Sequence, residues 1–482
     1  MTLTTEASTP APGIPPVAPQ SLAARLVEHA RRAKGLIIAV AGVGAVLSGL
    51  VGYYTTYKTV TGATTSTAAR PASADGVNPL SIVAAPFANL TGDPTQDYVA
   101  AGLTANVTSD LSRIRDAYIV AASTAAAAFK DKNADVQQVG KALGVRYVLQ
   151  GSVQRNGNKI RINAQLADTS SGAQLWTESF EADQGDLFAL QDRVTTRIGN
   201  SIGREMVVNG ARESEKRKSN PKVADLILRA RALSLVPRTV TYFDQIESLY
   251  REVLAMEPDN VNALVGLATN MALRAGYFGH TLPDAQAREK YYAQSKELAL
   301  KAKQLDPDYG LAYLALMLYA EAHDDYPGQL RAAQKAHELA PREPRLTQSL
   351  AHTFLMGGDG SGAKKLLEEA MSMDPKHPVD LILFNLGLSH FMLGDYDASI
   401  DWFQKAVETN STYFDAYGWI SMAYAIKDDM PNSQASLAKL RTADPKGSFV
   451  TRRKPMSSSP QAYKKFYNDT YLPAARKAGI MS

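Results

Sequence analysis

The sequence predicts a multidomain chain: one N-terminal transmembrane helix, an α+β domain with a mixed sheet, and then an all-α repeat solenoid. Three observations predict this order. They are an uncharged run from Gly35 to Tyr54, a β-α-β-α pattern over residues 78–205, and turn motifs about 34 residues apart over residues 222–446. The chain has 482 residues, which is long enough for two or three domains.

The composition excludes several classes of function. The net charge of +4 over 482 residues is too small to indicate the basic surface that binding to a phosphate backbone needs. We therefore predict no nucleic-acid partner. The chain has no cysteine, which excludes disulfides, thiolate metal sites and cysteine nucleophiles. None of the seven histidines has the H-E-x-x-H spacing of a zinc site. We therefore predict no metal, no cofactor and no catalytic residue.

A membrane anchor is expected ahead of the folded domains. A 20-residue helix is about 30 Å long and spans the hydrocarbon core, so we predict that Gly35 to Tyr54 crosses a membrane once. Basic residues crowd its N-terminal flank, whereas the first one on the other side is Lys58. The positive-inside rule then places residues 1–34 in the cytoplasm, as a disordered tail. The domains beyond the linker of residues 55–77 are placed outside the cytoplasm.

Two alternatives concern this apolar run. A cleaved signal peptide would need a small-residue cleavage site close behind it, but the A-x-A match Ala72–Ala74 lies well downstream. Small residues recur at every fourth position, at Gly44, Ser48 and Gly52. Ordinary membrane-helix composition accounts for this spacing, and the alternative is a homodimer, since small residues let two membrane helices approach closely.

Residues 78–205 are expected to form one α+β domain. Gly144 ends a predicted helix, and Asn156–Asn158 is a hairpin signal because Asn-Gly tolerates positive φ. The mixed sheet should therefore end in a three-stranded antiparallel meander. The predicted elements are strand Pro79–Phe87, turn Asn89–Pro94, helix Asp97–Ile114, strand Ala117–Ala121, helix Asp135–Gly144, strands Arg146–Arg155, Lys159–Ala167 and Ala173–Ala182, and helix Leu187–Ile202.

Several segments of this domain resemble one family. They include I-V-A-A-P-F-x-N-L-T-G-D-P from Ile82, L-G-V-R-Y-V-L-Q-G-S-V-Q-R from Leu143, R-I-N-A-Q-L-x-D from Arg161 and L-W-T-E-S-F from Leu175. These look like the TolB-type amino-terminal domain of bacterial membrane proteins. The resemblance implies a domain between a transmembrane helix and tetratricopeptide repeats, often with a class III adenylate cyclase or a winged-helix domain at the cytoplasmic end. Residues 1–34 hold no counterpart of either, so neither activity is expected.

Turn motifs recur through residues 222–446. Their first residues are 49, 34, 34, 36 and 34 positions apart, and the motifs are Glu257–Asp259, Asp306–Asp308, Ala340–Pro341, Asp374–Pro375, Asn410–Ser411 and Asp444–Pro445. A period of 34 is that of tetratricopeptide helix pairs, so we predict about six pairs and a C-terminal cap over residues 447–482. The longest interval holds extra residues near Phe278 to Ala287. They predict a longer loop or helix extension, with a ligand contact as the alternative.

The first helices of successive pairs line a concave groove in such solenoids. Offsets within the repeat predict a largely apolar, partner-binding stripe there, consisting of Leu314, Leu318, Arg345, Gln348, His352, Met356, Leu381, Phe384, Leu388, Phe391, Met392 and Met422. An exposed apolar groove indicates a protein or peptide partner. The alternative is that the first domain or the C-terminal tail packs into it.

Two other motifs are expected to be structural. Gly357–Lys364 resembles a phosphate loop, but its lysine does not directly follow the last glycine and no strand precedes it. The pairs Asp324–Asp325 and Asp428–Asp429 fall at turns within helix pairs, where Asp favours turns and helix starts.

We therefore expect a non-enzymatic, membrane-anchored sensor or scaffold that binds a protein or peptide. One alternative is a regulatory component of an adenylate cyclase or transcription-regulator system whose catalytic or DNA-binding domain is on another chain. Another is an enzyme that acts on a periplasmic polymer, which the lack of a nucleophile, metal or acid–base constellation disfavours.

Overall fold

The computed structural model describes residues 77–481 except 116, 122–123, 126–127, 130–134, 157–158, 184–186, 216–222, 237–238, 280–281, 412, 445–448 and 450–453. Val77–Ser482 forms one compact unit, separate from Met1–Gly76. The expected cytoplasmic tail, the anchor Gly35 to Tyr54 and all but the last residue of the linker lie outside the described residues. No helix among the described residues is long and apolar enough to cross a membrane.

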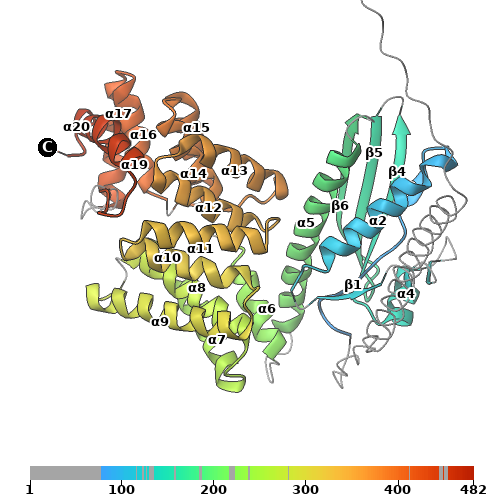
Figure 1. Cartoon of the computed structure of the whole chain (residues 1–482). Coiled ribbons are helices and arrows are strands. Elements are labelled where there is room, and N and C mark those ends of the chain that lie inside the picture. Colours follow the sequence, from blue (N-terminus) through green and yellow to red (C-terminus); the bar gives the residue numbers. More distant parts are fainter. Residues whose placement is uncertain are drawn as a thin grey trace, which may run out of the picture. The chain divides into compact units, whose positions relative to one another are not determined.

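A mixed sheet forms the centre of the first domain (Figure 1). Its strands are β1 (Ser81–Ala84), β2 (Ala88–Leu90), β3 (Tyr118–Val120), β4 (Tyr147–Asn156), β5 (Lys159–Asp168) and β6 (Gln174–Asp183). The order is β3-β1-β4-β5-β6, with β1 parallel to β3 and β4. The antiparallel meander β4-β5-β6 confirms the predicted hairpin pattern. One prediction is corrected. Asn89 was expected to begin a turn, but it lies in strand β2, which pairs in parallel with β4.

Helices cover both faces of this sheet. On one face lie α2 (Asp97–Leu111) and α5 (Leu187–Glu215), which share a hydrophobic core with the meander. On the other lies α4 (Val136–Leu143), whose buried Val139 packs with valines of the central strands. Gly144 caps α4 at φ 64°, a conformation that glycine adopts at little cost. A short 3-10 turn, η1 (Pro94–Gln96), precedes α2.

Helix α5 continues to Glu215, well past the predicted end at Ile202. Its buried Ile202 belongs to the core of the sheet domain, and so do Met206 and Ala211 further along. Gly210 faces Leu228 of the next helix, since a Cβ at Gly210 would lie 3.1 Å from the Leu228 side chain. One long helix therefore joins the sheet domain to the solenoid.

Within the described residues the solenoid contains six antiparallel helix pairs, as the period predicts. The pairs are α6 (Val223–Leu233) with α7 (Val240–Met256), α8 (Val261–Tyr277) with α9 (Ala285–Leu305), α10 (Gly310–Ala322) with α11 (Tyr326–Leu339), α12 (Pro344–Gly357) with α13 (Gly360–Met373), α14 (Asp380–Met392) with α15 (Tyr396–Thr409), and α16 (Asp415–Ile426) with α17 (Met430–Ala443). The chain ends with α19 (Gln461–Phe466), the π-helical turn η4 (Tyr467–Tyr471) and α20 (Leu472–Lys477).

Small residues set the contact between the two helices of a pair. A Cβ at Gly387 of α14 would lie 2.7 Å from the Phe403 ring of α15, so only glycine allows this approach. The Ser399 hydroxyl donates to the Gly387 carbonyl at 2.8 Å. The second pair departs from the common length because α8 has 17 residues, α9 has 21, and their connection is also longer. Both a longer loop and a helix extension thus account for the 49-residue interval.

Candidate partner-binding surfaces

Nine of the twelve predicted groove residues are buried and three are partly exposed. The buried ones are Leu314, Leu318, Gln348, His352, Leu381, Phe384, Leu388, Phe391 and Met422. The partly exposed ones are Arg345, Met356 and Met392. Most of the predicted apolar stripe is therefore hydrophobic core, and the assignment of these residues to a groove remains a prediction.

Contacts between repeats explain this burial. The Phe391 ring lies 5.0 Å from the Trp419 ring and 5.3 Å from that of Tyr396. Met422 joins the same core cluster and is fully buried. Large side chains on the first helices thus stack against the neighbouring pair, which leaves little apolar surface for a partner.

A polar network replaces the expected apolar surface in the middle of the array. His352 Nε2 lies 3.1 Å from Glu321 Oε1, and the Gln329 amide donates to Glu321 Oε2 at 3.3 Å. His352 and Gln329 are buried, so the Glu321 carboxylate ties α10, α11 and α12 together. Arg345, on the first turn of α12, pairs with Glu343 at 2.9 Å and keeps about a third of its side chain exposed (38%).

The turns that join successive helix pairs form one edge of the solenoid, the domain edge, which contacts α2 and α5. Arg342 Nη1 lies 2.6 Å from Asp110 Oδ1 of α2. The Asn200 amide of α5 donates to the Arg342 carbonyl at 3.2 Å. Lys376 Nζ lies 3.4 Å from Glu178 Oε2 of β6. Asp110 and Glu178 are each only 7% exposed, so buried carboxylates of the sheet domain meet cations of this edge.

Asn262, at the start of α8, is the hub of the domain edge. Its side-chain oxygen accepts from Arg115 Nε at 3.0 Å, from Arg231 Nη2 at 2.9 Å and from the Tyr309 hydroxyl at 3.3 Å. The Arg115 guanidinium also lies 3.9 Å from the centre of the Tyr309 ring and 2.8 Å from an Asp306 oxygen. Arg115 follows α2, so this contact fixes the end of α2 to two successive turns of the solenoid.

The turns within helix pairs form the opposite edge, the tail edge. Each of four such turns has one residue with positive φ, followed by the Asp that caps the second helix. The left-handed residues are Asp324, Gly358, Gly394 and Asp428, and the caps are Asp325, Asp359, Asp395 and Asp429. Glycine fits the left-handed region, whereas Asp occupies it at a cost. Two of the four repeats therefore keep a carboxylate where glycine would be less strained.

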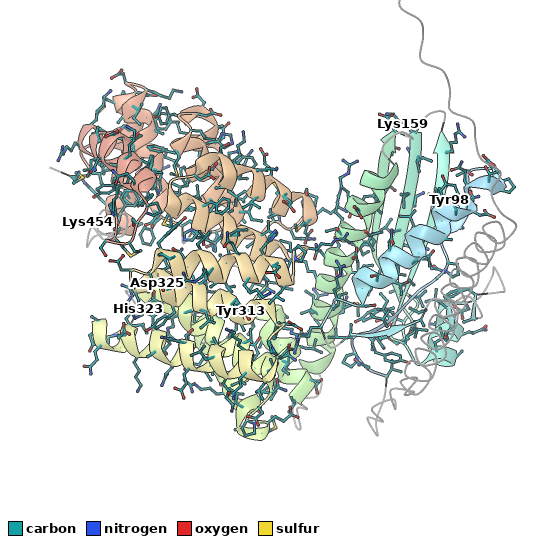
Figure 2. The ribbon with its side chains drawn as sticks, viewed as in Figure 1. Tyr98, Lys159, Tyr313, His323, Asp325 and Lys454 are labelled. Atoms are coloured by element: carbon teal, nitrogen blue, oxygen red, sulfur yellow. The ribbon has the colours of Figure 1, made fainter. Side chains whose placement is uncertain are left out.

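Those two carboxylates hold the C-terminal segment, residues 454–481. Asp324 accepts from the backbone N–H of Ser457 at 3.0 Å and of Ser458 at 2.8 Å. Hydrogen bonds from Ser457 and Ser458 hold the pKa of Asp324 well below its ordinary value of 3.8. Lys477 Nζ lies 2.6 Å from Asp428 Oδ1. Figure 2 shows Lys454, at the start of this segment, on the same side of the solenoid as Asp325.

Aromatic side chains anchor the segment between these two points. The Phe466 ring lies 6.3 Å from Phe391, and the buried Tyr471 ring lies 5.4 Å from Trp419. A Cβ at Gly358 would lie 2.5 Å from the Tyr463 nitrogen. The segment thus packs on the last helix pair, where a cap was expected, and also runs back along the tail edge. Its Phe466 ring contacts Phe391, one of the predicted groove residues.

Comparison with known proteins gives a family match for part of the helical region. Residues 381–413, which cover α14 and α15, match the tetratricopeptide repeat family. A protein of Rhizobium meliloti (strain 1021) named "Putative adenylate cyclase 3" is 37% identical over 189 residues. That stretch is 39% of this chain and 32% of the relative. The chain therefore matches about a third of the length of this curated relative.

Two solved structures are each similar to part of the chain. TTC0263, a thermophilic TPR protein of Thermus thermophilus, is 16% identical with a TM-score of 0.33, covering 42% of this chain and 98% of its own. Lipoprotein GNA1162 of Neisseria meningitidis is 23% identical with a TM-score of 0.21, covering 26% and 99%. Residues 381–413 are thus similar to a tetratricopeptide repeat, and they lie within a solenoid of six described helix pairs.

Proposed function

We propose that this chain is a non-enzymatic, membrane-anchored scaffold or sensor whose solenoid binds a protein or peptide. The tetratricopeptide match at residues 381–413 carries the proposal, because solenoids of this kind present extended surfaces to partners. Arg345 and Met356 are the contact positions on α12, since they keep exposed surface among the predicted groove residues. The TolB-type resemblance of residues 78–205 supports the role of an extracytoplasmic binding module.

The proposal includes the location. Gly35 to Tyr54 anchors the chain in a bacterial inner membrane, with the N-terminus in the cytoplasm and both folded domains in the periplasm. The charge difference across the apolar run supports this orientation. Reporter fusions at Ser482 test it: a periplasm-active reporter should be active there, and activity of a cytoplasm-only reporter would reverse the orientation.

Photocrosslinking in cells tests partner binding. A photoreactive residue at Met356 or Arg345 should give an intermolecular product that mass spectrometry identifies as a second protein. The same residue at Lys335, partly exposed on α11, serves as the control because second helices do not line the groove. Only intramolecular products from Met356 and Arg345 would contradict the proposal.

A second candidate is a regulatory component of an adenylate cyclase system, or of a transcription regulator, whose output domain is on another chain. The 37% identity to the Rhizobium meliloti relative favours it. Deletion of the gene should then change cyclic AMP in the parent cell, and re-expression should restore it. Unchanged cyclic AMP, together with a crosslinked partner that is not a cyclase, would favour the scaffold alone.

A further inference from the structure

The enlarged second helix pair forms a hollow of about 550 Å³. Its walls come from α7, α8, α9 and the α8–α9 connection, and the residues are Glu247, Arg251, Arg274, Leu282, Pro283, Ala287, Lys290, Tyr291 and Gln294. The added length of α8, α9 and their connection builds three of these walls. The insertion therefore creates a concave site that the shorter repeats lack the residues to form.

Cations outnumber carboxylates around this hollow. Arg274 Nη1 lies 2.5 Å from Asp244 Oδ1, and Arg251 Nε donates to Glu247 Oε1 at 2.8 Å. Lys290 is exposed and has no carboxylate within ion-pairing distance among the described residues. Three cations thus share two acids, which leaves one positive charge for a ligand.

Arg274 also retains unused hydrogen-bonding capacity. Its side chain is 11% exposed, and its Nε is buried without a hydrogen-bond partner among the described residues. A buried donor without a partner is costly. Contacts to Asp244 and the Tyr291 ring fix the guanidinium, and Glu247 Oε2 lies 3.9 Å from its Nη1. The part of Arg274 that a ligand can contact directly is the 11% of the side chain that stays exposed.

We propose that this hollow binds an acidic peptide segment in which a carboxylate side chain lies next to an apolar one. The carboxylate pairs with Lys290 and lies next to the exposed part of the Arg274 guanidinium. The apolar neighbour packs on Leu282, Pro283 and the Tyr291 ring. The inference rests on the proposed function, since it names the chemistry of a partner for the solenoid.

A peptide fits better than a small anion because of the position on the solenoid. The α8–α9 connection lies at a turn within a helix pair, so the hollow continues the tail edge toward the N-terminus. Further along this edge, from Asp324 to Asp428, a peptide segment is already seated, namely the C-terminal segment. There the edge is acidic and takes Lys477, whereas at the hollow it is basic.

Fluorescence anisotropy on the full chain in detergent tests the inference. The probe is a labelled peptide Gly-Glu-Leu-Glu-Leu-Gly, and its matched control has Gln in place of both Glu residues. We expect the acidic peptide to bind, the Gln peptide to bind at least tenfold more weakly, and salt to weaken binding. Lys290→Glu should weaken acidic-peptide binding about tenfold, which corresponds to ~1.4 kcal/mol.

Lys301→Glu is the matched variant control. It makes the same charge change on the same helix, but Lys301 contacts Asp259 at the domain edge, outside the hollow. Equal weakening by both variants, equal binding of both peptides or no binding of the acidic peptide would overturn the inference. If the acidic peptide does not bind while Met356 still crosslinks to a partner, only this inference is contradicted and the proposed function stands. If crosslinking from Met356 and Arg345 is absent while the hollow still binds the peptide, the groove proposal is contradicted and this inference stands.

Discussion

The two edges of the solenoid are both covered, but by different physical means. At the domain edge, the buried carboxylates of Asp110 and Glu178 pair with Arg342 and Lys376. At the tail edge, Asp324 and Asp428 make polar contacts near the surface. Between these two contacts, aromatic rings of the C-terminal segment are buried against the solenoid. Breaking a buried ion pair is costly, whereas exposed pairs contribute little. Charge should therefore govern the first edge and hydrophobic burial the second.

The largest effect is expected from removing the main aromatic anchor of the tail edge. Tyr471→Ala deletes a fully buried ring that packs on Trp419 and Phe449. Truncation of a buried aromatic residue to alanine costs about 4 kcal/mol. Urea unfolding of the full chain, followed by tryptophan fluorescence, should show this loss. Tyr467→Ala, at a partly exposed position of the same turn, should cost much less; equal losses would mean that ring burial does not hold this edge.

At the domain edge, Arg342→Met should destabilise the chain by about 3 kcal/mol, because it leaves the buried Asp110 carboxylate without its nearest Nη partner. Arg113, at 3.2 Å from Asp110, provides only partial compensation since its side chain is 57% exposed. Thermal unfolding measures the loss. Adding Asp110→Asn should recover part of it, and a double variant no more stable than Arg342→Met would show that charge does not govern this edge.

The left-handed carboxylates of the tail edge allow a sharper test. Asp324→Gly relieves the backbone conformation at φ 54° and removes the acceptor for Ser457 and Ser458. Global stability should stay nearly unchanged, while hydrogen exchange at residues 457–458 should rise about tenfold. Gly358, which occupies the same position in the next repeat, shows that glycine suits this turn. Unchanged exchange would mean that the aromatic rings alone fix the segment.

Local signals in the sequence predicted most of the fold. The strands on either side of Asn156–Asn158 pair as expected, and Gly144 caps α4 in the left-handed conformation. The 34-residue period located the helix pairs. Helix α5 exceeded its predicted length because Met206 and Ala211 continue the buried face beyond Ile202.

The candidate site was less predictable because exposure depends on tertiary partners. Offsets within a repeat place Phe391 and Met422 on the first helices, but they carry no information on the depth to which the next pair buries them. The period also says nothing about the C-terminal segment that packs on Phe391. One signal was available in the sequence: Asp324 and Asp428 stand where the other two repeats have glycine. It becomes interpretable only when their carboxylates are seen to hold residues 457 and 477.

The smallest effect is the response of the tail edge to pH. Hydrogen bonds from Ser457 and Ser458 lower the pKa of Asp324 in the folded chain below 3.8. A lowered folded pKa adds stability that is fully present above the unfolded pKa and is lost as the pH falls toward the folded pKa. Exchange at residues 457–458, corrected for intrinsic rates, should therefore be equal at about pH 7 and 5 and rise only below about pH 4.

Asp324→Asn separates this titration from other groups, because an amide keeps an acceptor oxygen and tolerates the left-handed conformation. The variant should lose the acid-induced rise and keep slow exchange at neutral pH. A rise between about pH 7 and 5 in the parent chain would instead mean that the Asp324 carboxylate does not control this contact.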